Sequence, residues 1–178
     1  MKKYLKWAII LIIAIGIFGA INGDSSSSDE ETKSESKTEK KEEKNVTYGI
    51  GQTIKVGDVE YTVNSINSSK KVGDEYFNHE AQEMYLIVNV SIKNNGDEAL
   101  TVSDDFFKLK KGKKEYTTDT GGSIYLENNI IYEDVNPEAT LTGNVLFDVT
   151  QETIDDSSLQ LQVQTGSWGT EKGLINLH

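Results

Sequence analysis

The sequence predicts an all-β fold built as a two-sheet antiparallel sandwich. The first observation is that, from Asn45 onward, short apolar runs alternate with turn residues at fairly regular spacing. The second is that no helical periodicity follows Ile21. About seven to nine short strands spaced in this way are typical of a sandwich rather than of an α/β enzyme scaffold.

Residues 84–93 form the clearest predicted strand and the expected centre of a sheet. Apolar side chains recur there at period two with polar side chains between them, which is the pattern of a strand with one buried face. The apolar set comprises Met84, Leu86, Val88, Val90 and Ile92. The segment Asn94-Asn95-Gly96 then ends the strand, because Asn and Gly tolerate the positive φ angles of tight turns.

The other predicted strands are shorter. They lie at residues 52–56, 59–66, 100–102, 106–109, 114–117, 140–149, 159–163 and 171–177. Ile66 breaks the alternation of its strand, which indicates a bulge or the end of the strand. Residues 67–83 are predicted to be a polar loop, and residues 118–139 form the longest stretch without alternation. The cysteine and tryptophan pattern of antibody domains is missing, so an immunoglobulin-like sandwich is predicted from architecture alone.

Two segments precede the predicted domain. Residues 1–23 combine basic residues with an uncharged apolar run, the pattern of a signal peptide or an uncleaved signal anchor. Residues 24–44 contain no aliphatic or aromatic side chain, so a disordered charged linker is predicted there. We therefore expect residues 45–178 to form a domain outside the cytoplasm, either secreted or held at the membrane by the N-terminal segment.

Composition argues against several kinds of function. The chain has no cysteine, which excludes disulfides, thiolate metal sites and cysteine nucleophiles. All 18 basic residues are lysine and the net charge is -11. Without arginine forks, and with this charge, binding to nucleic acid is not expected. We also predict no cofactor.

Four segments carry a resemblance to a known family. They are residues 57–63, 85–96, 136–138 and 143–149. In them the chain resembles the secreted immunoglobulin-like domains of unknown function in Gram-positive lipoproteins and surface proteins. These domains share their sandwich with the mycobacterial immunoprotective extracellular antigen. The resemblance covers about residues 49–177 and brings no catalytic residues with it.

The chain departs from that family in two places. The family usually has Pro-Gly where this chain has Pro137-Glu138, and many members have a lipid-anchor cysteine that this chain lacks. The first difference affects one turn. The second removes the expectation of a lipoprotein.

No catalytic motif is present, and we predict that the protein is not an enzyme. His79 and His178 are the only histidines, and no Gly-x-Ser-x-Gly nucleophile elbow accompanies them. Acid pairs could ligate calcium, which prefers oxygen ligands, or could simply be solvated turn residues. The candidate metal ligands are Asp104, Asp105, Asp155 and Asp156.

Two surfaces are candidates for binding. A predicted hairpin tip carries Lys110, Lys111, Lys113 and Lys114, which either meet an anionic envelope polymer or lipid headgroups, or protect a sheet edge from strand addition. Loop residues are the second candidate, either as contacts of a binding module or as a small satellite core. They are Tyr125, Ile130, Ile131, Tyr132 and Trp168.

Together these features predict a non-catalytic module that binds an unknown protein or cell-envelope component outside the cell. The alternative is an envelope structural or homeostasis protein, with calcium in the loops of the sandwich as a further option. A hydrolase with an unrecognised acid pair is the third hypothesis, and no motif supports it.

Overall fold

The computed structural model describes residues 48–165 and 171–178. The predicted signal segment, the predicted linker and Trp168 lie outside the described residues. Within the described ranges, no helix has both the length and the apolar character needed to cross a membrane.

Ten strands, two short α-helices and one 3-10 turn make up the described part of the chain. The strands are β1 (Thr53–Val56), β2 (Val59–Gly73), β3 (Asn78–Asn94), β4 (Leu100–Thr101), β5 (Phe107–Lys111), β6 (Lys114–Thr117), β7 (Asp134–Val135), β8 (Thr140–Val149), β9 (Gln160–Thr165) and β10 (Glu171–Asn176). The helical elements are η1 (Asp104–Phe106), α1 (Thr120–Ser123) and α2 (Gln151–Ile154).

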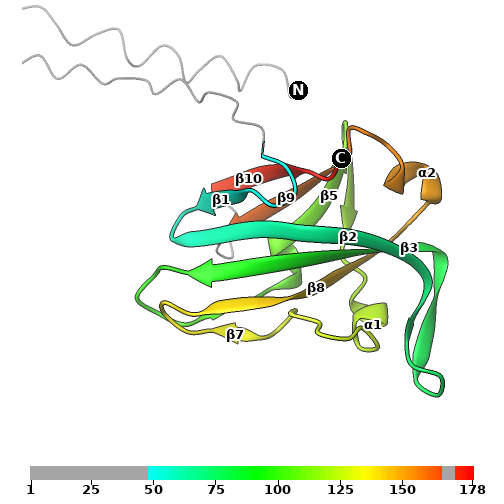
Figure 1. Cartoon of the computed structure of the whole chain (residues 1–178), viewed down its shortest axis with the longest axis horizontal. Coiled ribbons are helices and arrows are strands. Elements are labelled where there is room, and N and C mark those ends of the chain that lie inside the picture. Colours follow the sequence, from blue (N-terminus) through cyan, green and yellow to red (C-terminus); the bar gives the residue numbers. More distant parts are fainter. Residues whose placement is uncertain (1–47, 166–170) are drawn as a thin grey trace, which may run out of the picture. The chain divides into compact units, whose positions relative to one another are not determined.

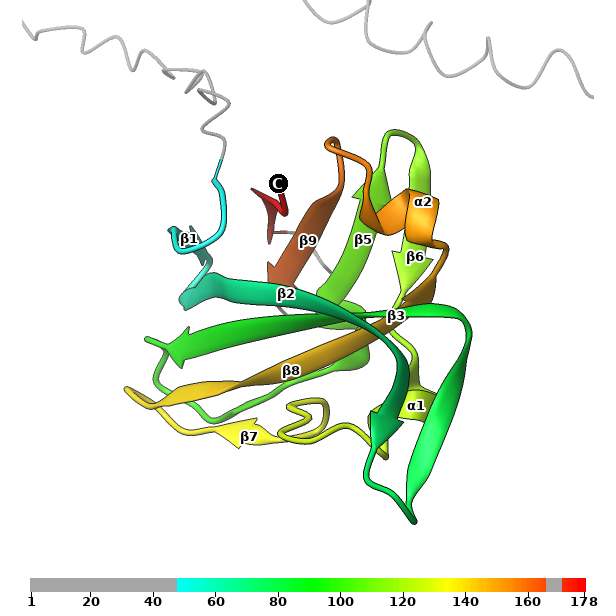
Figure 2. The same ribbon diagram turned by 45° about the vertical axis from the view of Figure 1, so that its right-hand side comes forward.

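The strands form two four-stranded sheets and one small sheet. The first has the order β1-β2-β3-β8 and the second the order β10-β9-β5-β6, while β4 pairs with β7. Every pairing between these strands is antiparallel. Figures 1 and 2 show the two larger sheets as separate layers. This confirms the predicted antiparallel β architecture.

β3 is the central strand, as its alternation predicts. It pairs with β2 on one side and with β8 on the other. Leu86, Val88, Val90 and Ile92 are fully buried, and Met84 packs against the same core. The opposite face is half-exposed over Asn89 and Ser91, so this strand separates the core from solvent.

A contact between Tyr61 and Phe107 joins the two large sheets. The ring of Tyr61 on β2 meets the ring of Phe107 on β5 edge to face, with 6.3 Å between centroids. The Tyr61 hydroxyl donates a hydrogen bond to the carbonyl oxygen of Gln164 on β9 at 2.8 Å. A buried phenol needs such a partner, and here the hydrogen bond also ties one layer to the other.

The prediction of a loop at residues 67–83 is wrong, because β2 and β3 continue through most of it. The two strands pair as far as Gly73 and Asn78. This extension is largely exposed on both faces, so no apolar alternation marks it in the sequence. The register shifts between Val63 and Ser65, which confirms the predicted irregularity near Ile66.

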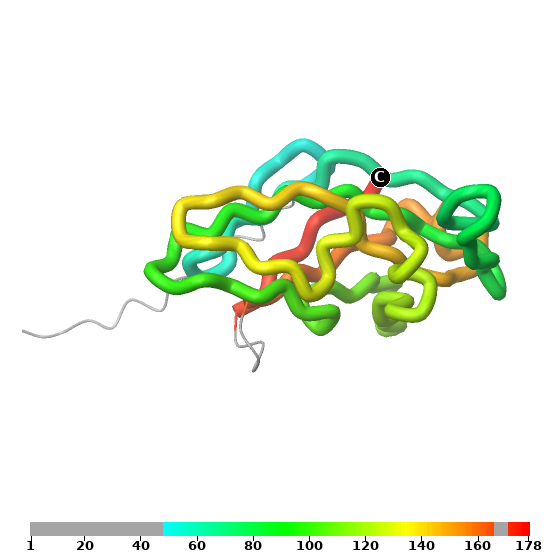
Figure 3. The backbone as a smooth tube through the Cα atoms, turned by 90° about the horizontal axis from the view of Figure 1, so that it is seen from below, coloured from blue at the N-terminus to red at the C-terminus, as the bar shows by residue number. Residues whose placement is uncertain are grey.

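Residues 118–139 are fixed along the outer edge of β8 (Figure 3). The backbone N–H of Asn144 donates to the carbonyl oxygen of Asn128 at 2.7 Å. Gly143 permits this approach, because a Cβ there would lie only 2.2 Å from the Asn128 oxygen. The segment therefore covers a sheet edge although it contributes only the two residues of β7 as strand.

Candidate functional site

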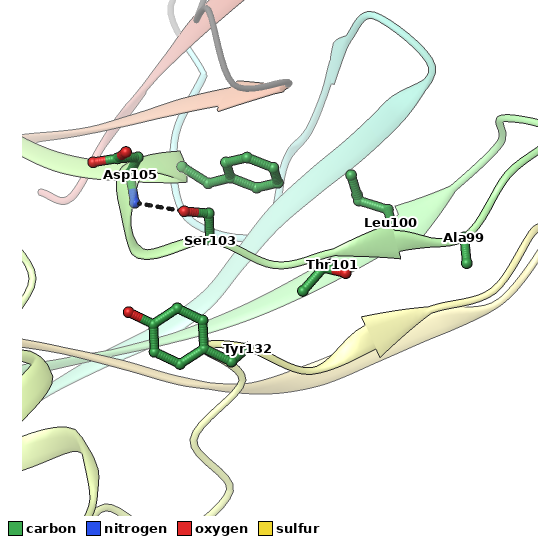
Figure 4. A pocket seen from close by; sticks show the side chains of 7 residues that line it. Ala99, Leu100, Thr101, Ser103, Asp105 and Tyr132 are labelled. Atoms are coloured by element: carbon green, nitrogen blue, oxygen red, sulfur yellow. Dashed lines mark hydrogen bonds between the residues drawn. The ribbon is translucent and has the colours of Figure 1, made fainter.

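A groove of about 470 Å³ lies beside β4 and η1 (Figure 4). Its lining residues are Ala99, Leu100, Thr101, Ser103, Asp105, Phe106 and Tyr132. Phe106 is almost completely buried, whereas Tyr132 is 66% exposed. The groove therefore combines an apolar base with an exposed aromatic ring and a carboxylate.

The 3-10 turn η1 shapes one end of this groove. Ser103 caps the turn: its hydroxyl accepts the N–H of Asp105, as the dashed line in Figure 4 shows. The N–H of Phe106 donates to the Ser103 carbonyl oxygen at 3.1 Å. Because the chain turns here, Phe106 enters the core while Asp105 stays exposed.

Tyr132 is held at the groove by the backbone. Its N–H donates to the Val102 carbonyl oxygen at 2.7 Å, and the Val102 N–H donates to the Glu133 carbonyl oxygen at 2.9 Å. Tyr132 has a φ of 71°, which is uncommon for an aromatic residue. Such a conformation persists only where the surrounding hydrogen bonds impose it.

The structure brings two of the sequence-predicted residues together. Tyr132, proposed as an aromatic contact, and Asp105, proposed as a calcium ligand, line the same groove. Sequence reasoning missed the other lining residues, because β4 is only two residues long and gives no periodic signal. The pairing of Leu100 with Val135 is what creates the site.

Ile130 and Ile131 do not belong to a binding surface. Their side chains are 1% and 4% exposed and form part of the main core. The sequence left two alternatives open, contact with a partner or burial in a satellite core; the structure excludes contact and places both side chains in the main core. The loop folds back on β8 and uses these two side chains to bury itself.

Tyr125 belongs to a second aromatic group, at the end of the β2–β3 hairpin. Its ring lies 4.3 Å from that of Phe77 and is stacked at 5.3 Å on His79, measured between centroids. Tyr76, in the same turn, is 91% exposed. Figure 2 shows the hairpin extending alongside α1. Sequence reasoning placed Tyr76 and Phe77 in a loop and did not select them.

The buried Tyr85 links this aromatic group to the sheet. Its hydroxyl lies 2.5 Å from Nδ1 of His79. Burial and the nearby carboxylate of Asp119 raise the pKa of Tyr85 to about 12. The phenol therefore stays neutral at ordinary pH and serves as a hydrogen-bonding group rather than as a base.

The four lysines of the β5–β6 hairpin divide into two kinds. Lys110 pairs with Glu115 on the neighbouring strand. Lys111 lies 3.3 Å from Asp156 and 3.4 Å from Glu152, so it ties the hairpin to the α2 region. Lys113 and Lys114 are exposed at the turn. Two of the four side chains are thus occupied within the domain.

The four candidate metal ligands are not assembled into a cation site. In residues 48–165 and 171–178, no three His, Cys, Asp or Glu side chains gather in a way that could hold a metal ion. Asp155 accepts a hydrogen bond from the Gln151 side chain at 2.8 Å. Ser158 hydrogen bonds, with help from Lys111, lower the pKa of Asp156 to about 2. Asp104 is half-buried in η1 and accepts a hydrogen bond from Ser103.

The fold and the groove define an antiparallel β-sandwich domain with an open surface site. Residues 48–173 match the family model described as a domain of unknown function, DUF4352, and the chain belongs to that family. An uncharacterised protein of Bacillus subtilis, YxkC, is 31% identical over 116 residues, which cover 60% of this chain and 64% of YxkC. The chain thus spans just under two thirds of the length of that relative.

Solved structures show the same fold. The YjhA protein of Bacillus subtilis has a TM-score of 0.56 at 17% identity, covering 74% of this chain and all of that one. The secreted protein MPT63 of Mycobacterium tuberculosis has a TM-score of 0.53 at 14% identity, covering 74% of this chain and 96% of that one. At these identities the likeness concerns the fold alone.

Proposed function

We propose that this protein is a non-catalytic binding module displayed outside the cytoplasm, and that the groove beside β4 contacts a protein or envelope component. The observation that carries this proposal is the exposed Tyr132 over the apolar base formed by Leu100 and Phe106. Exposed aromatic side chains beside an apolar base are typical binding contacts.

The location belongs to the same proposal. Its supports are the predicted signal segment at residues 1–23 and the secreted state given for the structural relative MPT63. We also propose that the two large sheets correspond to an immunoglobulin-like arrangement, with the groove at the small β4–β7 sheet as an addition to it. A fixed sandwich with binding contacts on its connecting segments is a common design for recognition.

The test is a crosslinking pull-down from intact cells that produce the full-length protein. Tyr132→Asn removes the ring, and Asn tolerates the positive φ at this position. Tyr76→Asn is the matched control, because Tyr76 is exposed in the β2–β3 hairpin and does not line the groove. We expect captured envelope proteins to fall at least about fivefold for Tyr132→Asn only, as for a central aromatic contact. Equal capture by both variants and the wild type would remove the groove from the proposal.

A further inference from the structure

We infer that the groove takes an extended cationic peptide segment of a partner protein. In this arrangement, a lysine or arginine side chain of the partner meets Asp105, and an adjacent apolar side chain packs on Leu100 and Phe106. The inference rests on the proposed function, because it names the class of partner for the same groove. Three properties of the site support it: its charge, the lack of an ion pair to Asp105 among the described residues, and its direction along β4.

The first support is charge. Residues 94–107 and 118–139, which build the groove and its surroundings, contain no lysine, arginine or histidine. They contain four and five acidic residues, respectively. These are Asp97, Glu98, Asp104, Asp105, Asp119, Glu127, Glu133, Asp134 and Glu138. A surface of one sign attracts a partner of the opposite sign and speeds the encounter.

The second support is that Asp105, the carboxylate among the lining residues, forms no ion pair with another residue that the structure describes. The ion pairs found among the described residues all involve Lys110 or Lys111 on the β5–β6 hairpin. Their acidic partners are Glu115, Glu152 and Asp156, none of which lines the groove. Asp105 is exposed at the groove wall and is therefore accessible to a cation from outside.

The third support is direction. Ala99, Leu100 and Thr101 are successive residues, and all three line the groove, so the groove follows β4. In the part of the chain that the structure describes, β4 has β7 as its only partner strand. An extended peptide fits such a path, because alternate side chains can face different parts of the wall.

The residues around Asp105 suit a peptide that has a cationic side chain next to an apolar one. A charge-assisted hydrogen bond from an ammonium or guanidinium group to a carboxylate is stronger than a neutral one. Tyr132 lines the same groove and is 66% exposed, and an exposed aromatic ring can attract a cation. Leu100 is only half-buried and therefore leaves apolar surface for a neighbouring aliphatic side chain, while Phe106, which is 4% exposed, contributes only its edge to the groove.

The experiment is a titration of the purified full-length protein, in neutral detergent, with the fluorescent peptide acetyl-Gly-Lys-Leu-Lys-Gly-amide. Binding is measured by anisotropy and repeated with acetyl-Gly-Glu-Leu-Glu-Gly-amide and acetyl-Gly-Lys-Gly-Lys-Gly-amide. We expect the lysine–leucine peptide to bind, the glutamate peptide not to bind, and the peptide without leucine to bind more weakly. Raising the salt concentration should weaken binding, because exposed charge pairs are screened.

Matched variants locate the site. Asp105→Asn should weaken binding of the lysine–leucine peptide about tenfold, as the loss of one charge-assisted hydrogen bond implies. Glu75→Gln removes the same charge from the exposed β2–β3 turn and should leave the affinity unchanged. Both positions are exposed, so thermal melting should show that both variants fold. Tyr132→Asn is the second groove variant and should also weaken binding.

Two results overturn the inference. The first is equal binding of the lysine and glutamate peptides, or no binding of either. The second is equal weakening by Asp105→Asn and Glu75→Gln, which would show attraction to overall charge rather than to the groove. If Tyr132→Asn abolishes capture of envelope proteins but the lysine–leucine peptide does not bind, the binding-module proposal stands and the cationic partner is wrong. If the peptide binds in the groove while capture is unchanged by Tyr132→Asn, the groove prefers a cationic peptide but is not where the envelope partner binds, and it is removed from the proposed function.

Discussion

Glu138 adopts a backbone conformation that an L side chain disfavours. It has a φ of 65° in the turn before β8, where the Ala139 N–H donates to the Asn136 carbonyl oxygen at 3.0 Å. Pro137 pre-sets the first central position of this turn, and glycine is preferred at the second. Glycine at position 138 would therefore fit this turn better than glutamate does.

Glu138→Gly should raise the free energy of unfolding by about 0.5–1 kcal/mol, because relief of the left-handed strain outweighs the entropy cost of glycine. The measurement is the urea midpoint at an unchanged m-value. Glu127→Gly is the control, since Glu127 is exposed and its φ is not positive. The explanation fails if both substitutions shift the midpoint in the same direction and by the same amount.

Tyr61 should make stability depend on pH in the alkaline range. Burial raises the pKa of Tyr61 to about 12, above the value of about 10 in an unfolded chain. The folded state thus holds the proton more tightly. The contribution of the Tyr61 proton to the free energy of unfolding is complete below about pH 10. As the pH rises from about 10 to about 12, up to about 2–3 kcal/mol of this contribution is lost.

Tyr61→Phe removes this contribution together with the hydrogen bond to the Gln164 carbonyl oxygen. Urea unfolding at about pH 9 and about pH 11 should show a large stability difference from the wild type at the lower pH and a smaller one at the higher pH. Val63→Ala, at another fully buried position of the same strand, should keep its difference constant. If the stability difference between Tyr61→Phe and the wild type is the same at both pH values, the alkaline pH dependence does not come from Tyr61.

Among the elements, the end of the β2–β3 hairpin is held against the segment after α1 by contacts of Phe77 and His79 with Tyr125. The hairpin turn is closed by Asp74, whose carboxylate accepts the N–H groups of Tyr76 and Phe77 at 2.7 and 2.6 Å. These hydrogen bonds lower the pKa of Asp74. Phe77 then packs its ring against Tyr125 from the segment that follows α1.

Phe77→Ala should loosen this end of the hairpin without unfolding the sandwich. The free energy of local opening should fall by about 1 kcal/mol, which is the contribution of one aromatic pair. This loss should be confined to the hairpin and the Tyr125 segment. Amide hydrogen exchange should become faster in residues 74–80 and unchanged in β9. Tyr76→Ala removes an exposed ring from the same turn and should leave exchange unaltered; an equal effect of both would show that Tyr125 is not the anchor.

The β5–β6 hairpin is tied to α2 by Lys111, and this element should show a small, salt-dependent effect. Lys111→Met removes the contacts with Asp156 and Glu152 and should lower the urea midpoint slightly at low salt, with the loss of stability vanishing in high salt. Urea unfolding at two salt concentrations measures it. Lys113→Met is the control, since Lys113 is exposed and takes part in no ion pair among the described residues. A loss for Lys111→Met that persists in high salt would point to packing instead.

At the scale of the whole molecule, the distribution of charge and the proposed location act together. From Asn45 onward there are 10 lysines against 21 acidic residues, so the domain region accounts for the full charge of -11. A strongly acidic domain stays soluble and repels anionic polymers and lipid surfaces. It favours cationic partners, in agreement with the groove.

The predicted location has a direct test. Protease added to intact cells should digest the domain, as followed by an epitope placed after His178, because the domain is proposed to face outward. A cytoplasmic protein in the same cells should survive and serves as the control for lysis. Full protection of the epitope until the cells are broken would refute the extracytoplasmic location.

Local sequence patterns predicted a strand and its buried face correctly wherever buried and exposed side chains alternate along that strand. The alternation of apolar and polar side chains across residues 84–93 predicted both this part of β3 and its buried face. Successive side chains of a strand point to opposite faces, so every second residue meets the core. The same reasoning missed the β2–β3 extension, where both faces meet solvent. It also left open whether Ile130 and Ile131 contact a partner or are buried, because an apolar loop residue has the same sequence signal in both cases.

Periodicity, motifs and composition were enough to predict the antiparallel β architecture, the family and the acidic character of the domain. The residues of the groove are brought together only by the tertiary structure. Tyr132 lines the same groove as Ser103 and Asp105 because the two-residue strands β4 and β7 pair and the pairing continues through the Tyr132–Val102 hydrogen bond. Pairing between segments distant in the chain depends on the packing of the whole sandwich, so neither composition nor periodicity could place these residues together.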